Sequence, residues 1–146
     1  MPPVAWSAVR SKLAQHLRPL LVGVSVYDGP IVSGDAPLAY LTIAHSPCAD
    51  SGEEGSFQQD VGPDGFSVTE TGTILAEIGA VTGDSHVPDA FAIFAAVASW
   101  IQSDMTLGGT LGAGSTCTVS AQVVQAQTTA GAVQRLQLTV SYFTRI

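Results

Sequence analysis

Hydrophobic residues recur at helical spacing near the start of the chain. Trp6, Val9, Leu13 and Leu17 form one stripe, and most of the polar residues between them lie off it. This spacing predicts an amphipathic helix of about four turns that packs on a sheet. Pro19 is expected to end it.

The next part of the chain carries the pattern of strands. Residues 22–26 alternate apolar and small or polar positions, which predicts a short strand, and 38–44 are apolar on both faces, as in a central strand. Residues 66–81 are rich in Thr, Val and Ile and predict one long strand. Within it, Gly72 and Gly79 mark expected bulges or bends.

A second helix is predicted at about 87–103, with Ser85 or Asp84 as its N-cap. Its sequence is apolar nearly all round, and Phe91 and Trp100 lie on different sides of it. A helix without a polar face is not an ordinary surface helix. We therefore expect one side to meet the sheet, and the other to meet the first helix or a neighbouring subunit.

The last third of the chain predicts a long hairpin. Residues 105–115 are rich in glycine and are expected to form a flexible connector, after which 116–127 and 133–144 alternate as two strands joined by a turn at 128–131. The predicted fold is a single α+β domain over 1–146. It has a mainly antiparallel (mixed) β-sheet, two α-helices packed on one face and a long C-terminal β-hairpin.

An acidic loop is expected at about 46–65. This segment holds four glycines, two prolines and five acids, although 55–59 could form a short strand inside it. Loops of this length are uncommon in compact domains and tend to be functional or disordered. Two interpretations stay open, a contact loop that orders on assembly and a plain mobile excursion.

Charge narrows the classes of function. The net charge is −7, and no Lys or Arg lies between Pro19 and Gln134, where all twelve acids are found. This distribution argues against nucleic-acid binding by phosphate neutralisation. It fits either an ordinary acidic protein or an acidic wall that faces a polyanion or a basic partner.

Motifs for catalysis or metal binding are missing from the sequence. The glycines of 109–116 lack the lysine of a phosphate loop, and Ser85 has no base or oxyanion donors assigned to it. His16 and His45 stand alone. We expect a protein that is not an enzyme and has no cofactor and no metal.

Cysteine usage and hydropathy indicate the compartment. Cys48 and Cys117 lack metal or redox spacing, so both are expected to be free thiols in a reducing cytoplasm. The start of the chain lacks the pattern of a signal peptide, and the longest apolar run is far too short to cross a bilayer. We expect a soluble, unsecreted chain without a membrane partner.

Several blocks of the sequence resemble one family. They read VSVYDGPIVSGDAPLAYLTIAH, VTGDSHVPDAFAIFAAVASWIQSDMTLGG and, at the end, QTTAGAVQRLQLTVSYFTRI. From about Trp6 to Ile146 the chain is similar to the tail terminator (tail completion, minor tail) proteins of long-tailed bacteriophages. The resemblance implies two helices packed on a sheet and a homohexameric ring that caps the tail tube, ends its polymerisation and provides the joint to the head.

The resemblance also implies partners and a location. They are further copies of the chain, the tail tube protein and a head–tail connector or neck protein, at the head-proximal end of the tail in the virion and in the host cytoplasm during assembly. DNA would only pass through the lumen. The alternatives are another ring-forming neck or tail-tube-like phage component and a small cytoplasmic enzyme or ligand-binding domain. By position in the chain we expect subunit or tube contacts at Asp50, Glu53, Glu54, Phe57, Asp60, Asp64, Phe91, Trp100, Thr129 and Ala130.

Overall fold

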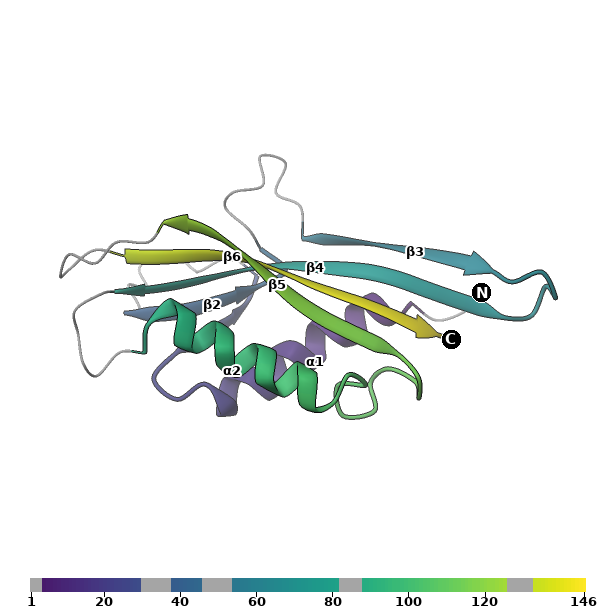
Figure 1. The fold of residues 1–146 in the computed structure, drawn as a ribbon, viewed down its shortest axis with the longest axis horizontal. Coiled ribbons are helices and arrows are strands. Elements are labelled where there is room, and N and C mark those ends of the chain that lie inside the picture. Colours follow the sequence, from purple (N-terminus) through teal and green to yellow (C-terminus); the bar gives the residue numbers. More distant parts are fainter. Residues whose placement is uncertain (1–3, 30–37, 46–53, 82–87, 126–132) are drawn as a thin grey trace.

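The computed structural model describes residues 4–29, 38–45, 54–81, 88–125 and 133–146 of the chain. These residues form two helices and six strands (Figure 1). In chain order the elements are α1 (Ala5–Leu20), β1 (Ser25–Asp28), β2 (Ala39–Ile43), β3 (Gly55–Val61), β4 (Val68–Val81), α2 (Ala90–Ser103), β5 (Thr116–Gln125) and β6 (Val133–Arg145).

One mixed sheet contains all six strands, in the order β1-β2-β4-β6-β5 with β3 paired to β4. The β1–β2 pair is parallel and every other pair is antiparallel. β2 pairs with residues 76–80 of β4, β3 pairs with 68–74, and β6 runs along the whole of β4. The predicted α+β fold with a mainly antiparallel sheet and two helices is confirmed.

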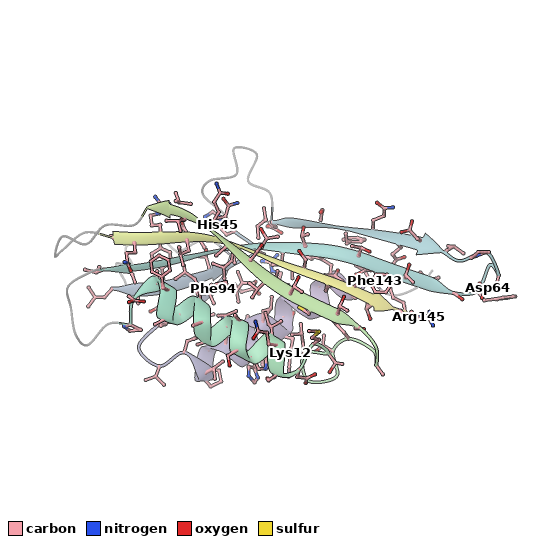
Figure 2. The ribbon with its side chains drawn as sticks, viewed as in Figure 1. Lys12, His45, Asp64, Phe94, Phe143 and Arg145 are labelled. Carbon is pink, nitrogen blue, oxygen red and sulfur yellow. The ribbon has the colours of Figure 1, made fainter. Side chains whose placement is uncertain are left out.

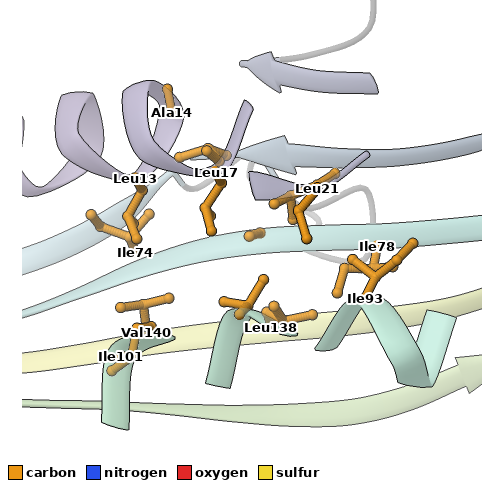
Figure 3. Packing of buried hydrophobic residues seen from close by; sticks show 14 of the residues in the cluster. Leu13, Ala14, Leu17, Leu21, Ile74, Ile78, Ile93, Ile101, Leu138 and Val140 are labelled. Atoms are coloured by element: carbon orange, nitrogen blue, oxygen red, sulfur yellow. The ribbon is translucent and has the colours of Figure 1, made fainter. Parts of the chain in front are cut away.

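Both helices cover the same face of the sheet (Figure 1). α1 contacts β1, β2 and β4, whereas α2 contacts β4, β5 and β6. Figure 3 shows Leu13 of α1 near Ile74, and Ile101 of α2 near Val140. The residues of β4 and β6 that alternate toward the helices are buried, as the pattern of apolar positions predicts.

The hairpin of β3 and β4 reaches past the helices at one end of the molecule (Figure 1). We call β3, the turn at 62–67 and residues 68–74 of β4 the arm. The short strand considered at 55–59 within the expected acidic loop is confirmed, and it extends to Val61 as β3. Its polar sequence has little strand preference of its own, and the free edge of β4 supplies the backbone partners that decide its conformation. The rest of the loop, 46–53, lies outside the described residues.

The helix boundaries differ from the prediction. α1 continues to Leu20 with Pro19 inside its last turn, and the amide of Leu21 still donates to the Leu17 carbonyl at 3.0 Å. α2 begins at Ala90 rather than near 87. Its N-cap is Asp89, whose carboxylate accepts the amide of Ala92 at 2.7 Å. The predicted caps Asp84 and Ser85 lie outside the described residues.

Two further expectations are wrong. The first strand covers Ser25–Asp28 rather than 22–26. The segment at 105–115 is not a flexible connector within the fold, because Leu107 and Leu111 are buried in the core. The Asp104 carboxylate accepts the amide of Gly108 at 2.9 Å and holds the first of its turns.

Candidate assembly surfaces

A buried carboxylate fixes the arm to the body of the protein. Glu70 of β4 has no exposed surface. Its oxygens accept hydrogen bonds from the hydroxyl of Tyr142 at 2.6 Å, the side-chain amide of Gln59 at 2.9 Å and the backbone N–H of Ala5 at 3.1 Å. Since Val4 offers α1 no side-chain cap, Glu70 takes that role from another element. The Glu70 carboxylate therefore connects β4 to β3, β6 and α1.

Gly72 makes room for Tyr142 in this cluster. The two residues are paired across β4 and β6, and the tyrosine ring lies over the glycine. A Cβ atom at Gly72 would be 2.4 Å from that ring. The register between β4 and β6 is continuous at this point, so the predicted bulge is wrong. Burial and the bond to Glu70 raise the pKa of Tyr142 above its usual value.

A second cluster repeats the arrangement on the opposite face of the sheet. Glu77 is buried, and it accepts hydrogen bonds from Tyr40 at 3.0 Å and from Arg135 at 2.7 and 3.1 Å. The Tyr40 ring lies over Gly79, where a Cβ atom would be 2.3 Å away. The bulge expected at Gly79 is therefore wrong too. Burial, with Glu77 nearby, raises the pKa of Tyr40 to about 12.

The sheet face that the helices leave uncovered is rich in hydroxyl and amide side chains. On the arm, Ser56 and Thr73 lie across from each other with their oxygens 3.2 Å apart, and the Gln58 amide donates to Asp60 at 3.1 Å. Phe143 is 41% exposed on this face. Figure 2 places it beside Arg145 at the end of β6. Such a surface offers polar contacts and few charges.

The start of α1 covers the inner part of the helix-side face of the arm, at Glu70 and Ile74, while the outer part of this face is exposed and carries apolar residues. Val61, Val68 and Ile146 form one row across β3, β4 and β6, because Val61 pairs with Val68 and the amide of Ile146 donates to the Val68 carbonyl. Val61 is 65% exposed, and Phe57 on the same face is 48% exposed. A hollow of about 440 Å³ lies between Phe57 and Trp6 of α1. The row of core residues thus continues past the end of the helix layer.

The outer face of α2 is a second surface that the described residues leave uncovered, and it carries small residues and no charge. Its buried stripe consists of Ala90, Ile93, Val97 and Ile101. Facing away from the sheet, Ala92, Ala95 and Ser99 are exposed, and the helix contains no charged residue. Phe91 at its start is 44% exposed. Surfaces of this kind on a folded chain are typical of contacts with other proteins.

One predicted contact residue on α2 is already packed within the chain. The Trp100 ring stacks on His16 of α1, with ring centres 4.0 Å apart and planes 10° apart. This stack joins the two helices over the sheet. Trp100 thus contacts α1, while Ala92, Ala95 and Ser99 lie on another side of α2 and are exposed.

The described acidic candidates lie on the arm or, in the case of Glu54, just before it. Glu54 pairs with Arg10 at 3.0 Å, and Arg10 also pairs with Asp28 at 2.6 Å. Asp64 shapes the turn at the arm's tip, where it accepts bonds from the hydroxyl and amide of Ser67 and the amide of Phe66. These bonds lower the pKa of Asp64 to about 2. Figure 2 shows Asp64 at the far end of the molecule.

The structure thus gathers Phe57, Asp60 and Asp64 on the arm, with Glu54 just before it, and places Phe91 on α2. The other four candidates, Asp50, Glu53, Thr129 and Ala130, lie outside the described residues. Sequence reasoning missed two exposed apolar residues of the arm, Val61 and Phe66, the latter 90% exposed. The signal for both was an apolar residue beside a Gly-Pro-Asp-Gly turn.

Cys117 is buried with a free thiol, and burial raises its pKa to about 11. Cys48 lies outside the described residues. Within the described part of the chain, no three His, Cys, Asp or Glu side chains gather as a metal site would need. None of the described helices has the length and apolar character to span a membrane.

No family model matches the sequence, and no curated protein matches it.

Proposed function

We propose that the chain is a structural protein of a long-tailed bacteriophage, a tail terminator whose subunits form a ring on the tail tube. The ring, a hexamer, ends tube polymerisation and provides the joint to the head. The observation that carries the proposal is a pair of separate surfaces that the described residues leave uncovered, the apolar outer part of the arm and the uncharged outer face of α2. A subunit that contacts neighbours on both sides needs two such surfaces.

Charge supports the same proposal. Positions 20–133 contain no Lys or Arg, so a lumen lined from this stretch repels phosphate and lets DNA pass without binding it. The partners are then other copies of the chain, the tail tube protein and a head–tail connector. The site of action is the head-proximal end of the tail, after assembly in the host cytoplasm.

Loss of the protein tests the proposal in the phage that encodes it. A nonsense mutation in its gene should give tubes of variable and excessive length that fail to join heads, seen by negative-stain electron microscopy. Supplying the wild-type chain from a plasmid should restore uniform length. Tails of normal length that carry heads in the mutant would contradict the proposal. Normal-length tails without heads would favour a neck component instead.

A further inference from the structure

We propose that the helix-side face of the arm docks on the outer face of α2 of a second copy of this chain. The inference rests on the proposed ring and deepens it, since it names the two surfaces that meet and makes the contact head-to-tail. One surface lies at the arm end of the molecule. The other lies along α2, beneath the part of the sheet that is away from the arm (Figure 1).

The outer part of the arm, on both sides of the turn at 62–67, extends past both helices (Figure 1). Toward the middle of the molecule, α1 and α2 bury the helix-side residues of β4 and β6. Farther out the same rows continue through Phe57, Val61 and Ile146, which are 48%, 65% and 38% exposed. An apolar helix laid on this row would extend the existing layer of helices over the sheet.

α2 has the composition and length to be that helix. Its outer residues Ala92, Ala95 and Ser99 are small, so the large side chains of the arm can approach the helix closely. The helix has 14 residues and spans about 21 Å, and β3 has seven residues and spans about 23 Å. The lengths therefore match. Because α2 carries no charge, the contact buries no ion on its side.

A groove at the start of α2 can receive the tip of the arm from a neighbouring copy of the chain. Phe66, 90% exposed, lies in the turn between β3 and β4. A groove of about 160 Å³ is lined only by apolar residues, Leu20 and Val22 among them together with Ala92 and Ala96 of α2. With the arm lying along α2, the Phe66 ring of one copy enters the groove of the next.

The edge strand β3 carries one feature that keeps exposed strands apart, the charged side chain of Asp60. Its seven residues include no lysine and no proline, and its register with β4 has no bulge. The Leu75 amide donates to Glu54 and the Gly62 amide donates to Ser67, so the ladder pairs the even-numbered residues of β3 with β4. The backbone groups of Phe57 and Val61 consequently point away from β4, next to the apolar face.

Two variants test the two surfaces separately. Val61→Glu places a charge on the arm, and Ala95→Glu places one on the outer face of α2. Both positions are exposed, so the monomer should remain folded. Thr71→Glu, on the opposite face of the arm, and Gln15→Glu, on α1, are matched controls at exposed positions. Light scattering over a range of concentrations measures the association, and circular dichroism checks the fold.

We expect Val61→Glu and Ala95→Glu each to weaken self-association at least about tenfold, while both controls associate as the wild type does. An equimolar mixture of the two variants should form a 1:1 heterodimer and grow no further. In that mixture one intact arm meets one intact α2, and the remaining two surfaces are blocked. Phe66→Ser should give a smaller loss of association than Val61→Glu.

The inference is overturned by a mixture that stays monomeric, by single variants that associate like the wild type, or by a wild type that is monomeric at every concentration. These outcomes are distinct from failure of the proposed function. A heterodimer in the mixture together with normal tails in the nonsense mutant would keep the contact and reject the terminator. Overlong tails in the nonsense mutant with no heterodimer in the mixture would keep the terminator and reject the contact.

Discussion

The hydroxyl of Tyr142 donates a 2.6 Å hydrogen bond to the buried carboxylate of Glu70, across two neighbouring strands. Tyr40 makes the equivalent bond to Glu77 at 3.0 Å on the other face of the sheet. In each case the tyrosine ring covers the glycine two residues after the glutamate. Because Glu70 and Glu77 are seven positions apart, an odd number, the two clusters face opposite sides of β4.

Alanine at these glycines should destabilise the fold to different extents. In Gly72→Ala the new Cβ would be 2.4 Å from the ring of Tyr142, which is 2% exposed and has no room to move. We expect the free energy of unfolding to fall by about 1–3 kcal/mol. Gly79→Ala should cost less, because half-buried Tyr40 can turn toward solvent. Urea denaturation measures both, with Thr71→Ala as the control, and equal stabilities for Gly72→Ala and the control would contradict the packing argument.

Removal of the two tyrosine hydroxyls should also have unequal effects. Tyr142→Phe takes one of the donors from fully buried Glu70 and should lower the free energy of unfolding by about 1–3 kcal/mol. Tyr40→Phe should cost less, since Glu77 keeps both bonds from Arg135. Equilibrium denaturation of the two variants gives the comparison. A larger cost for Tyr40→Phe would show that the clusters are ranked wrongly.

Alkaline pH should weaken the folded state through the same tyrosines. The pKa of Tyr40 is about 12 in the folded chain, against an ordinary value of about 10, because burial disfavours the phenolate. The folded state therefore holds this proton more tightly than the unfolded state. Its contribution to stability is complete below pH 10 and is lost as the pH rises toward 12. Denaturation at a series of pH values should show this decline in the wild type and a shallower one in Tyr40→Phe.

Arg10 should contribute modestly by joining three elements. Its guanidinium bonds Asp28 at the end of β1 and Glu54 just before β3, and the bond to Asp28 raises the pKa of Arg10. Both carboxylates are partly exposed, so Arg10→Ala should cost about 0.5–1 kcal/mol at low salt and less at high salt. Denaturation at two salt concentrations tests this expectation. A cost that does not change with salt would point to lost packing against Trp6 instead.

Much of the fold could be predicted because its elements carry strong periodic patterns. The alternation at 133–144 gives β6 almost to the residue, and the stripe from Val9 to Leu17 gives the buried side of α1. β3 was harder, because Gly-Ser-Phe-Gln-Gln-Asp-Val has no clear period. The edge of β4 makes it a strand, and that edge is a tertiary feature.

The candidate surfaces were only partly predictable for a similar reason. An uncharged helix indicates an extra contact, but the sequence does not show that Trp100 is taken by His16 while Ala95 faces outward. Likewise, Gly72 and Gly79 looked like bulges, because the tyrosines that require them lie far away in the chain at 142 and 40. The pairing of β4 with β6 and with β2 therefore decides the roles of Gly72 and Gly79.

Capping of tail tubes in vitro is the most direct test of the central claim. Purified tail tube protein would be polymerised with and without this chain carrying a gold label, and the tubes would be imaged by negative-stain electron microscopy. We expect the tubes to become shorter as the chain is added, with the gold label at one end of each tube only. Tube lengths that do not change, or label scattered along the tube wall, would contradict it.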